Sequence, residues 1–202
     1  MIDDIIVIDN VIPVKAQEQL KDFFFSKKPN WIFFRDIALS EVDIKRRGIT
    51  KLTPGIGCYI KQDYPPFIDD NLLNLVKPIP NRACETIGGS CSDIFNVRSF
   101  MHFPLEQSLR KEYDNPHIDI KYDHLVVLYY VNDTDGDTFI FDKTLEDYSE
   151  LPENVELNVI KKVSPKMGRV VVFNGNRYHS SSTPTKDIRC IINFNVKFKT
   201  NE

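Results

Sequence analysis

The pattern of apolar and polar positions changes near residue 95 of the chain. Beyond it, short runs rich in β-branched and aromatic residues recur, which is typical of strands. Turn sequences such as NDTDGD, SPKMG and NGN separate these runs. The pattern predicts strands over residues 95–103, 124–132, 137–142, 155–163, 168–174 and 189–198. Because no helical pattern lies between them, we expect antiparallel sheets packed as a sandwich or barrel.

Before residue 95 the spacing of apolar residues is helical in places. Residues 13–26 open with proline and place Ala16 and Leu20 on one helical face. A second helix is predicted from Asp69, where an Asp pair precedes a leucine-rich segment that ends at a proline. A third helix is predicted within residues 81–88.

Length and composition favour one globular domain. A chain of 202 residues can bury one substantial core, and 42% apolar with 27% charged residues is ordinary for such a domain. We therefore predict a mainly β fold in a single domain. Its jelly-roll core is expected at about residues 93–200, and supporting N-terminal α-helices are expected within about residues 1–92.

Charge and cysteine content exclude some classes of function. A net charge of −3 favours neither a nucleic-acid nor a membrane partner. The sequence shows no signal peptide and no transmembrane run, so we expect a cytoplasmic protein. The four cysteines form no C-x-x-C pair and are interpreted as free thiols. The oligomeric state stays open.

The stretch NPHIDIKYDH, residues 115–124, contains a candidate metal site. If it is a strand, His117 and Asp119 point to one side, although a solvent-facing strand edge has the same pattern. Two ligands rarely suffice for a catalytic metal, and the third candidate is His179, directly after the apolar run GRVVVF. Two histidines and one carboxylate form a facial triad with open positions, which suits non-haem Fe(II) and dioxygen chemistry.

A candidate anion site follows ten residues later, at Arg189. Because a turn lies between the two residues, we expect Arg189 on the strand beside the one that carries His179. A guanidinium can hold a carboxylate through two parallel hydrogen bonds. An acid that binds iron at one end and arginine at the other is what 2-oxoglutarate offers.

These residues resemble the motifs of the Fe(II) and 2-oxoglutarate-dependent oxygenases, most closely the prolyl 4-hydroxylase-like group. The resemblance covers roughly residues 95–198 and implies a double-stranded β-helix core. It implies iron bound by His117, Asp119 and His179 as the catalytic centre, and the 2-oxoglutarate 5-carboxylate held by Arg189. The motifs are HID (117–119), LYYVN (128–132), DGDTFIF (135–141), PKMGRVVVF (165–173), His179 and Arg189.

The resemblance also implies a role for one tyrosine of the YY pair. Tyr130, with Tyr129 as second choice, is expected to hydrogen-bond the same carboxylate. Two departures from the family pattern stand out. Asp135-Gly136-Asp137 lies where many relatives have two glycines, and Arg189 lies where collagen-type prolyl hydroxylases have lysine.

The activity implied is C–H hydroxylation with release of succinate and CO2. Its cofactors are Fe(II), 2-oxoglutarate and O2, with ascorbate as an optional reductant. The leading substrate prediction is a prolyl residue of a protein or peptide, and the alternative is a free amino acid or small metabolite. A non-catalytic jelly-roll binding module is the rival from another class.

The remaining histidines and one basic run have simpler interpretations. His124 is expected to be a surface or hydrogen-bonded histidine, and His102 a packed residue or a wall of the pocket. The basic run 43–51 is expected to be a charged solvated loop, or else a mobile lid over the pocket within residues 43–55.

Overall fold

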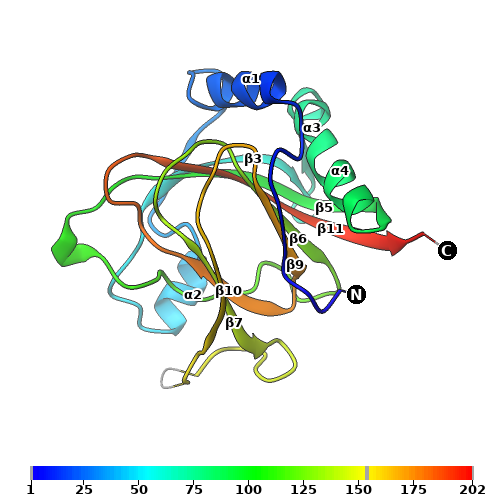
Figure 1. Cartoon of the computed structure of the whole chain (residues 1–202). Helices are drawn as coiled ribbons and strands as arrows, with labels where there is room; N and C mark the ends of the chain where they lie inside the picture. The colour runs from blue at the N-terminus through cyan, green and yellow to red at the C-terminus, as the bar shows by residue number, and fades with distance from the viewer. Residues whose placement is uncertain (1, 153–154, 202) are drawn as a thin grey trace.

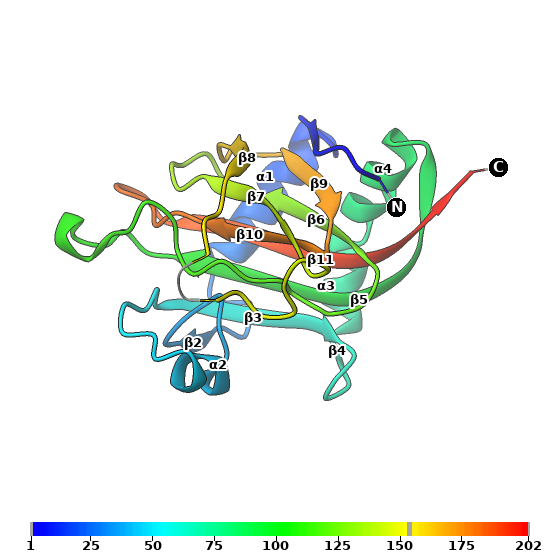
Figure 2. The same ribbon diagram turned by 90° about the horizontal axis from the view of Figure 1, so that it is seen from below.

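A large antiparallel sheet forms one layer of the protein (Figure 1). This computed structural model describes residues 2–152 and 155–201. Neighbouring strands of the sheet are antiparallel throughout. Its order is β1 (Ile6–Ile8), β9 (Val170–Asn174), β6 (Leu125–Tyr130), β11 (Arg189–Thr200), β5 (Gly89–His102), β3 (Gly55–Gln62) and β2 (Ile32–Phe34), with β4 (Phe67–Ile68) paired to β3. Figure 2 shows β3, β5 and β11 running side by side.

A smaller sheet packs against the inner face of the large one. Its order is β10 (Arg177–Ser181), β7 (Thr138–Thr144) and β8 (Val159–Val163). Ile140 of β7 and Val163 of β8 share one apolar cluster with Phe100 of β5 and Ile191 of β11. Two antiparallel sheets packed in this way confirm the predicted mainly β, jelly-roll fold, a double-stranded β-helix.

Three helices cover the outer face of the large sheet: α1 (Val14–Phe24), α3 (Asp70–Val76) and α4 (Pro78–Thr86) (Figure 1). Their buried side chains, such as Phe24 and Ile79, pack with Val127 of β6 and Phe194 of β11. All three predicted helices are present, and the third begins three residues earlier than expected. A short 3-10 turn follows at Gln107–Leu109.

Side-chain alternation on β6 and β11 separates the apolar outer face from a partly polar inner face. On β6, Leu128 and Tyr130 face the smaller sheet, whereas Tyr129 faces the helices. On β11, the inner positions include Arg189 and Asn193, while the intervening residues Cys190, Ile192, Phe194 and Val196 belong to the outer core. Polar residues buried between two sheets mark a functional interior.

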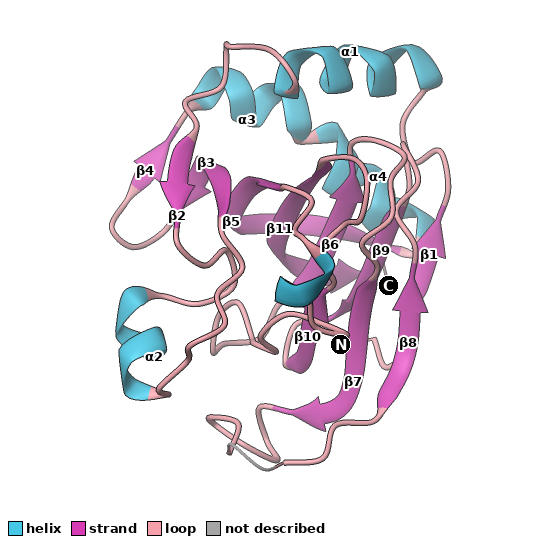
Figure 3. Cartoon of the chain, turned by 90° about the vertical axis from the view of Figure 1, so that its left-hand side faces the viewer, coloured by secondary structure: helices cyan, strands magenta, loops and turns pink. Residues whose placement is uncertain are grey.

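Some elements differ from the sequence predictions. Residues 1–92 also supply strands β1 to β4 to the large sheet, in addition to the helices. The expectation of a charged loop over 43–51 is wrong at its start, because α2 (Glu41–Arg46) is a helix that lies apart from the others (Figure 3). Ser40 caps it by accepting the Asp43 N–H at 3.1 Å.

Cys58, Cys84, Cys91 and Cys190 are free thiols, as expected. Among residues 2–152 and 155–201, no helix combines the length and the apolar character that crossing a bilayer requires.

Candidate metal centre

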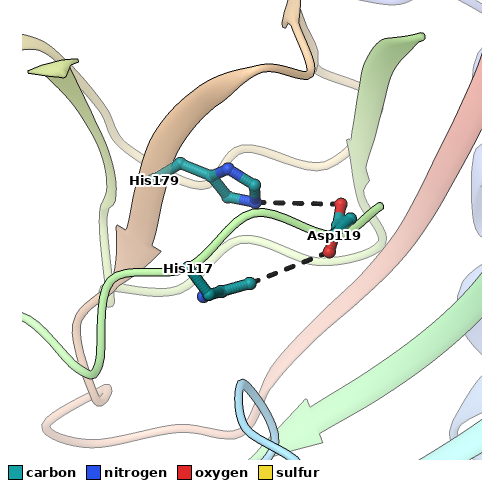
Figure 4. Close-up of side chains that lie close together, drawn as sticks. All are labelled: His117, Asp119 and His179. Atoms are coloured by element: carbon teal, nitrogen blue, oxygen red, sulfur yellow. Dashed lines mark ion pairs between the residues drawn. The ribbon is translucent and has the colours of Figure 1, made fainter. Parts of the chain in front are cut away.

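Backbone pairing brings the two candidate histidine ligands together. The stretch 115–124 does not form a strand, and within it only His117 makes a β-bridge, an isolated antiparallel one with His179 of β10. The His117 N–H donates to the His179 carbonyl at 3.0 Å, and the His179 N–H donates back at 3.1 Å. The two rings consequently lie with centroids 4.6 Å apart (Figure 4).

Hydrogen bonds fix the orientation of both imidazoles. Nδ1 of His117 lies 3.1 Å from the Asn115 carbonyl, and Nδ1 of His179 lies 3.1 Å from the Arg177 carbonyl. Because a carbonyl oxygen only accepts, each Nδ1 carries a proton, and in the neutral ring Nε2 then keeps a free lone pair that can bind a metal. Burial lowers the pKa of His179 to about 4, so its ring is neutral at physiological pH.

Asp119 completes the group from the loop after His117. Its carboxylate oxygens lie 3.7 Å from Nε2 of His117 and 3.8 Å from Nε2 of His179 (Figure 4). One ligand atom from each of the three residues lies within 4.8 Å of the others. The structure therefore brings together all three residues that the sequence predicted for a metal.

Three donors hold the Asp119 carboxylate, whose side chain is 2% exposed. Arg98 Nη2 donates to Oδ1 at 3.1 Å, and the amides of Asn193 and Asn195 donate to Oδ2 at 2.8 Å each. Burial alone would raise the pKa of Asp119, but the charge of Arg98 and these hydrogen bonds hold it well below its usual range. Asp119 is therefore ionised and available to a cation.

The donor set fits a divalent transition metal such as Fe(II). Two imidazole nitrogens and one carboxylate oxygen come from one side, which leaves the opposite side of an ion free for other ligands. Carbonyl groups behind the imidazoles and amides behind the carboxylate supply the outer hydrogen bonds that orient metal ligands.

A pocket between the two sheets connects this centre to Arg189. His117, Asp119 and His179 line one part of it, and Thr138 and Arg189 line another. Both parts border on β11. Asn193 of this strand donates to Asp119, and Arg189 lies four residues before Asn193, about 13 Å away along the strand.

Arg189 is a buried cation that forms no ion pair with an acid among the described residues. It is 2% exposed, and its Nε and Nη2 donate to the Gly136 carbonyl at 2.6 Å and to Thr138 Oγ1 at 3.0 Å. Over residues 2–152 and 155–201, no carboxylate oxygen lies within 4.0 Å of this guanidinium. A buried charge needs a counter-charge, so this end of the pocket is suited to an anion.

One expectation about strand order is wrong. Arg189 does not lie on the strand beside His179, because β11 belongs to the large sheet and β10 to the small one. The two residues face each other across the interior instead of along one sheet. Only this arrangement leaves a pocket between them.

Tyr130 reaches the Arg189 end, but indirectly. Its ring centroid is 5.7 Å from Arg189 Cζ, and its hydroxyl donates to Thr138 Oγ1 at 2.7 Å. Thr138, not Tyr130, lines the pocket, and its oxygen accepts from both Tyr130 and Arg189, which leaves the Thr138 proton free for a ligand. Tyr129 faces the helices.

Sequence reasoning missed several residues of the site: Arg98, Gly136, Thr138, Asn193 and Asn195. The one sequence signal for them is the alternation in DTFIFD and RCIINFNV, which places Thr138, Asn193 and Asn195 among apolar strand residues. The other two histidines are placed as follows. His102 lines the pocket, whereas His124 is buried and donates from Nδ1 to the Tyr122 carbonyl at 2.7 Å, so the surface alternative for His124 is wrong.

Comparison with known proteins rests on structure alone. No protein-family model matches the chain, and no curated protein matches its sequence. The chain is similar to the non-haem alpha-ketoglutarate-dependent epimerase SnoN from nogalamycin biosynthesis, with TM-score 0.61 and 9% identity over 98% of this chain and 78% of that one. A second SnoN structure, with TM-score 0.57, is a complex with Fe3+, alpha ketoglutarate and nogalamycin RO.

Two prolyl hydroxylases are also similar. One is from Trichoplax adhaerens, in complex with a hypoxia-inducible factor peptide, with TM-score 0.56 and 14% identity over 95% of this chain and 82% of that one. The other is a prolyl-4-hydroxylase from Pseudomonas putida, with TM-score 0.51 and 12% identity over 96% and 92%. At such identities the likeness establishes a shared fold.

Proposed function

We propose that this chain, which has the jelly-roll fold of the 2-oxoglutarate and Fe(II) oxygenases, is a 2-oxoglutarate-dependent dioxygenase that hydroxylates a C–H bond. A single observation carries the proposal. One pocket joins a His-Asp-His group to a buried arginine that has no acidic partner in the described part of the chain. A non-catalytic binding module needs neither, and still less the two together.

The residues divide the work between two ends of the pocket. His117, Asp119 and His179 would hold Fe(II), which supplies oxidation of a C–H bond by O2 coupled to conversion of 2-oxoglutarate to succinate and CO2. Arg189 would bind the 5-carboxylate of 2-oxoglutarate through charge-assisted hydrogen bonds. Thr138 would donate its free proton to the same carboxylate, and Tyr130 would hold Thr138 in place.

The apolar part of the lining has a role of its own. Phe100, Leu128 and Ile191 line the pocket between its charged parts, and Ile37 and Ala38 add apolar surface from the β2–β3 connection. These side chains offer water no hydrogen bonds, so they strengthen the charged contacts inside the pocket and limit side reactions.

A prolyl residue of a protein or peptide is the substrate we propose first. Two structures of this fold are prolyl hydroxylases, and one of them holds a peptide. A free amino acid or small metabolite is the second candidate, favoured by the likeness to SnoN, which comes from nogalamycin biosynthesis. Mass spectrometry for the gain of one oxygen atom, on proline-containing peptides and on lysate metabolites, distinguishes the two.

The reaction class is tested without a known substrate. Anaerobic addition of Fe(II) and 2-oxoglutarate should give a weak visible absorption band that neither gives alone, and air with ascorbate should then yield succinate. Asp119→Ala should remove both signals, because an ionised metal ligand is lost.

Arg189→Gln should retain metal binding and raise the KM for 2-oxoglutarate by about tenfold or more, because a charge-assisted hydrogen bond contributes roughly 1.5–3 kcal/mol. Arg82→Gln, at an exposed position of α4, is the matched control and should behave as wild type. Succinate yield and KM unchanged in both Asp119→Ala and Arg189→Gln would reject the proposed function.

A further inference from the structure

The guanidinium of Arg98 lies beside the metal centre. Metal binding by the centre does not require this positive charge. Resting on the function proposed above, we propose that Arg98 binds a carboxylate of the substrate next to the C–H bond that reacts. The substrate would then be a carboxylate-bearing one, with its acidic group close to the reacting carbon.

Strand pairing places Arg98 between the centre and the outside. On β5 it lies opposite Asn193 of β11 on one side and opposite Tyr59 of β3 on the other. It lines both the pocket of the metal centre and a neighbouring groove formed by residues 33–41, Tyr59 and Phe100. Its side chain is 26% exposed. A ligand in the groove can therefore reach the guanidinium and the metal centre at once.

Most of the guanidinium is unused. In the part of the chain that the structure describes, Arg98 makes one side-chain hydrogen bond, from Nη2 to Asp119 Oδ1 at 3.1 Å. Its Cζ also lies 5.5 Å from the ring centroid of Phe100. The N–H groups of Nε and Nη1 make no such bond, and a guanidinium can donate two parallel hydrogen bonds to one planar carboxylate.

Holding Asp119 in place does not explain an arginine here. The amides of Asn193 and Asn195 already fix the other carboxylate oxygen without any charge. A guanidinium, by contrast, competes with a bound cation for the same negative charge and weakens Asp119 as a ligand. A third neutral donor would position the carboxylate equally well, so the positive charge has another use.

Charge balance points the same way. With Fe(II) and 2-oxoglutarate bound, the two carboxylates of 2-oxoglutarate offset Arg189 and one charge of the ion, and Asp119 offsets the other. Among the charged groups that line the pocket, Arg98 then leaves one positive charge over, in a partly buried position.

The acids of the groove do not supply that counter-charge. Glu41 pairs with Arg35 at 3.1 Å. Asp36 accepts hydrogen bonds from the N–H groups of Ala38, Leu39 and Thr53 and from the Asn115 amide. A substrate carboxylate in the groove would complete the balance.

The groove suits a carboxylate on an otherwise apolar ligand. Tyr59 faces the same groove, and its hydroxyl has no hydrogen-bond partner over residues 2–152 and 155–201. Phe34 packs edge-on against both Tyr59 and Phe100, at 5.9 and 5.8 Å between centroids. The carboxylate could be the α-carboxylate of a free amino acid or an acidic side chain beside a prolyl residue of a peptide.

Matched pairs of probes test the inference. One set is the common free amino acids, each against its carboxamide. The other is N-acetylated, C-amidated tripeptides in which proline precedes Asp or Glu, against the same peptides with Asn or Gln. The measurements are succinate formed above the substrate-free background and gain of one oxygen on the probe. We expect kcat/KM to favour the carboxylate member of at least one pair by about tenfold or more.

Variants of Arg98 separate substrate binding from simple positioning. Arg98→Gln should reduce that preference to below about threefold, mainly through KM, and Arg98→Lys should restore part of it because the charge returns. Fe(II) affinity of Arg98→Gln should equal or exceed that of wild type, because a competitor for Asp119 is gone. Arg82→Gln, at an exposed position of α4 outside the pocket and the groove, should keep the full preference.

Several results would overturn the inference. These are equal use of acid and amide by the wild type, a preference that survives in Arg98→Gln, weaker Fe(II) binding by Arg98→Gln, or no carboxylate probe raising succinate above background. If the visible band and substrate-free succinate are present in the same samples, the proposed function stands and only the role of Arg98 fails. Absence of both would reject the proposed function and this inference with it.

Discussion

At the residue scale, Gly136 helps to orient the Arg189 guanidinium toward the pocket. The Gly136 carbonyl accepts Nε at 2.6 Å, and it can do so because Gly136 has φ +94°, a conformation that residues with a Cβ avoid. Space is also short there, since a Cβ on Gly136 would lie 2.9 Å from Arg189 Cδ and 2.9 Å from the Ser182 carbonyl oxygen. The DGD sequence thus supplies the one glycine that this site needs.

Gly136→Ala should therefore raise the KM for 2-oxoglutarate by about tenfold and lower the free energy of unfolding by about 1–3 kcal/mol. Steady-state succinate assays and urea unfolding measure the two effects. Gly48→Ala is the matched control, because Gly48 has φ +62° but nothing within 4 Å of an added Cβ. A KM for Gly136→Ala equal to that of Gly48→Ala would contradict a role of Gly136 in positioning Arg189.

At the scale of elements, the connection between β2 and β3 is tied to the metal centre by one carboxylate. Asp36 Oδ1 accepts the N–H groups of Ala38 and Leu39 at 2.9 Å. Its Oδ2 accepts the Thr53 N–H at 3.0 Å and the Asn115 amide at 3.1 Å. Asp36 therefore closes the base of the segment that carries α2 and fastens it to the chain just before His117.

Asp36→Ala should loosen this segment, because buried N–H groups lose their acceptor at a cost of about 1–3 kcal/mol each. Trypsin cleavage at the lysines and arginines between residues 45 and 51 should become about tenfold faster or more. Asp22→Ala, at an exposed position of α1, should cleave at the wild-type rate. Cleavage unchanged by Asp36→Ala would mean that the segment is held by other contacts. Whether it acts as a lid stays a prediction.

At the scale of the whole molecule, the space between and around the sheets holds histidines in their neutral form. Burial lowers the pKa of His102 well below its usual value, and the charge of Arg189 lowers it further. Burial also lowers the pKa of His124, which outweighs its hydrogen bond to the Tyr122 carbonyl. Protonation of either ring in the folded protein would place a charge in the interior without its hydration, so folding opposes it.

Stability should consequently fall as the pH drops below about 6.5, the usual pKa of histidine in an unfolded chain. Between that pH and the lower folded-state pKa, the unfolded chain binds more protons, so each such histidine lowers the free energy of unfolding by up to about 1.4 kcal/mol per pH unit. Urea unfolding of the metal-free protein at pH 7.5 and 5.5 measures this slope. His124→Gln should reduce it, and an unchanged slope would contradict the assignment.

The sequence was sufficient for those parts of the fold that have a local signature. Apolar runs such as those at 168–174 and 189–198 predicted the central strands, and helical spacing predicted α1. β10 was missed because RYHSS has no apolar run, and α2 because it is only six residues long and four of them are charged. The short strands β1 and β2 have little pattern of their own and exist through pairing with β9 and β3.

For the site, the sequence alone determined the chemistry of the main groups: the types and order of His117, Asp119, His179 and Arg189 already indicated a metal end and an anion end. Tertiary structure decided what surrounds them. Arg98, Thr138 and Gly136 matter only because strand register and the facing of two sheets bring them within hydrogen-bond reach of residues far away in the chain. Such contacts depend on long-range pairing, and residue spacing along one chain carries no record of which strand lies opposite.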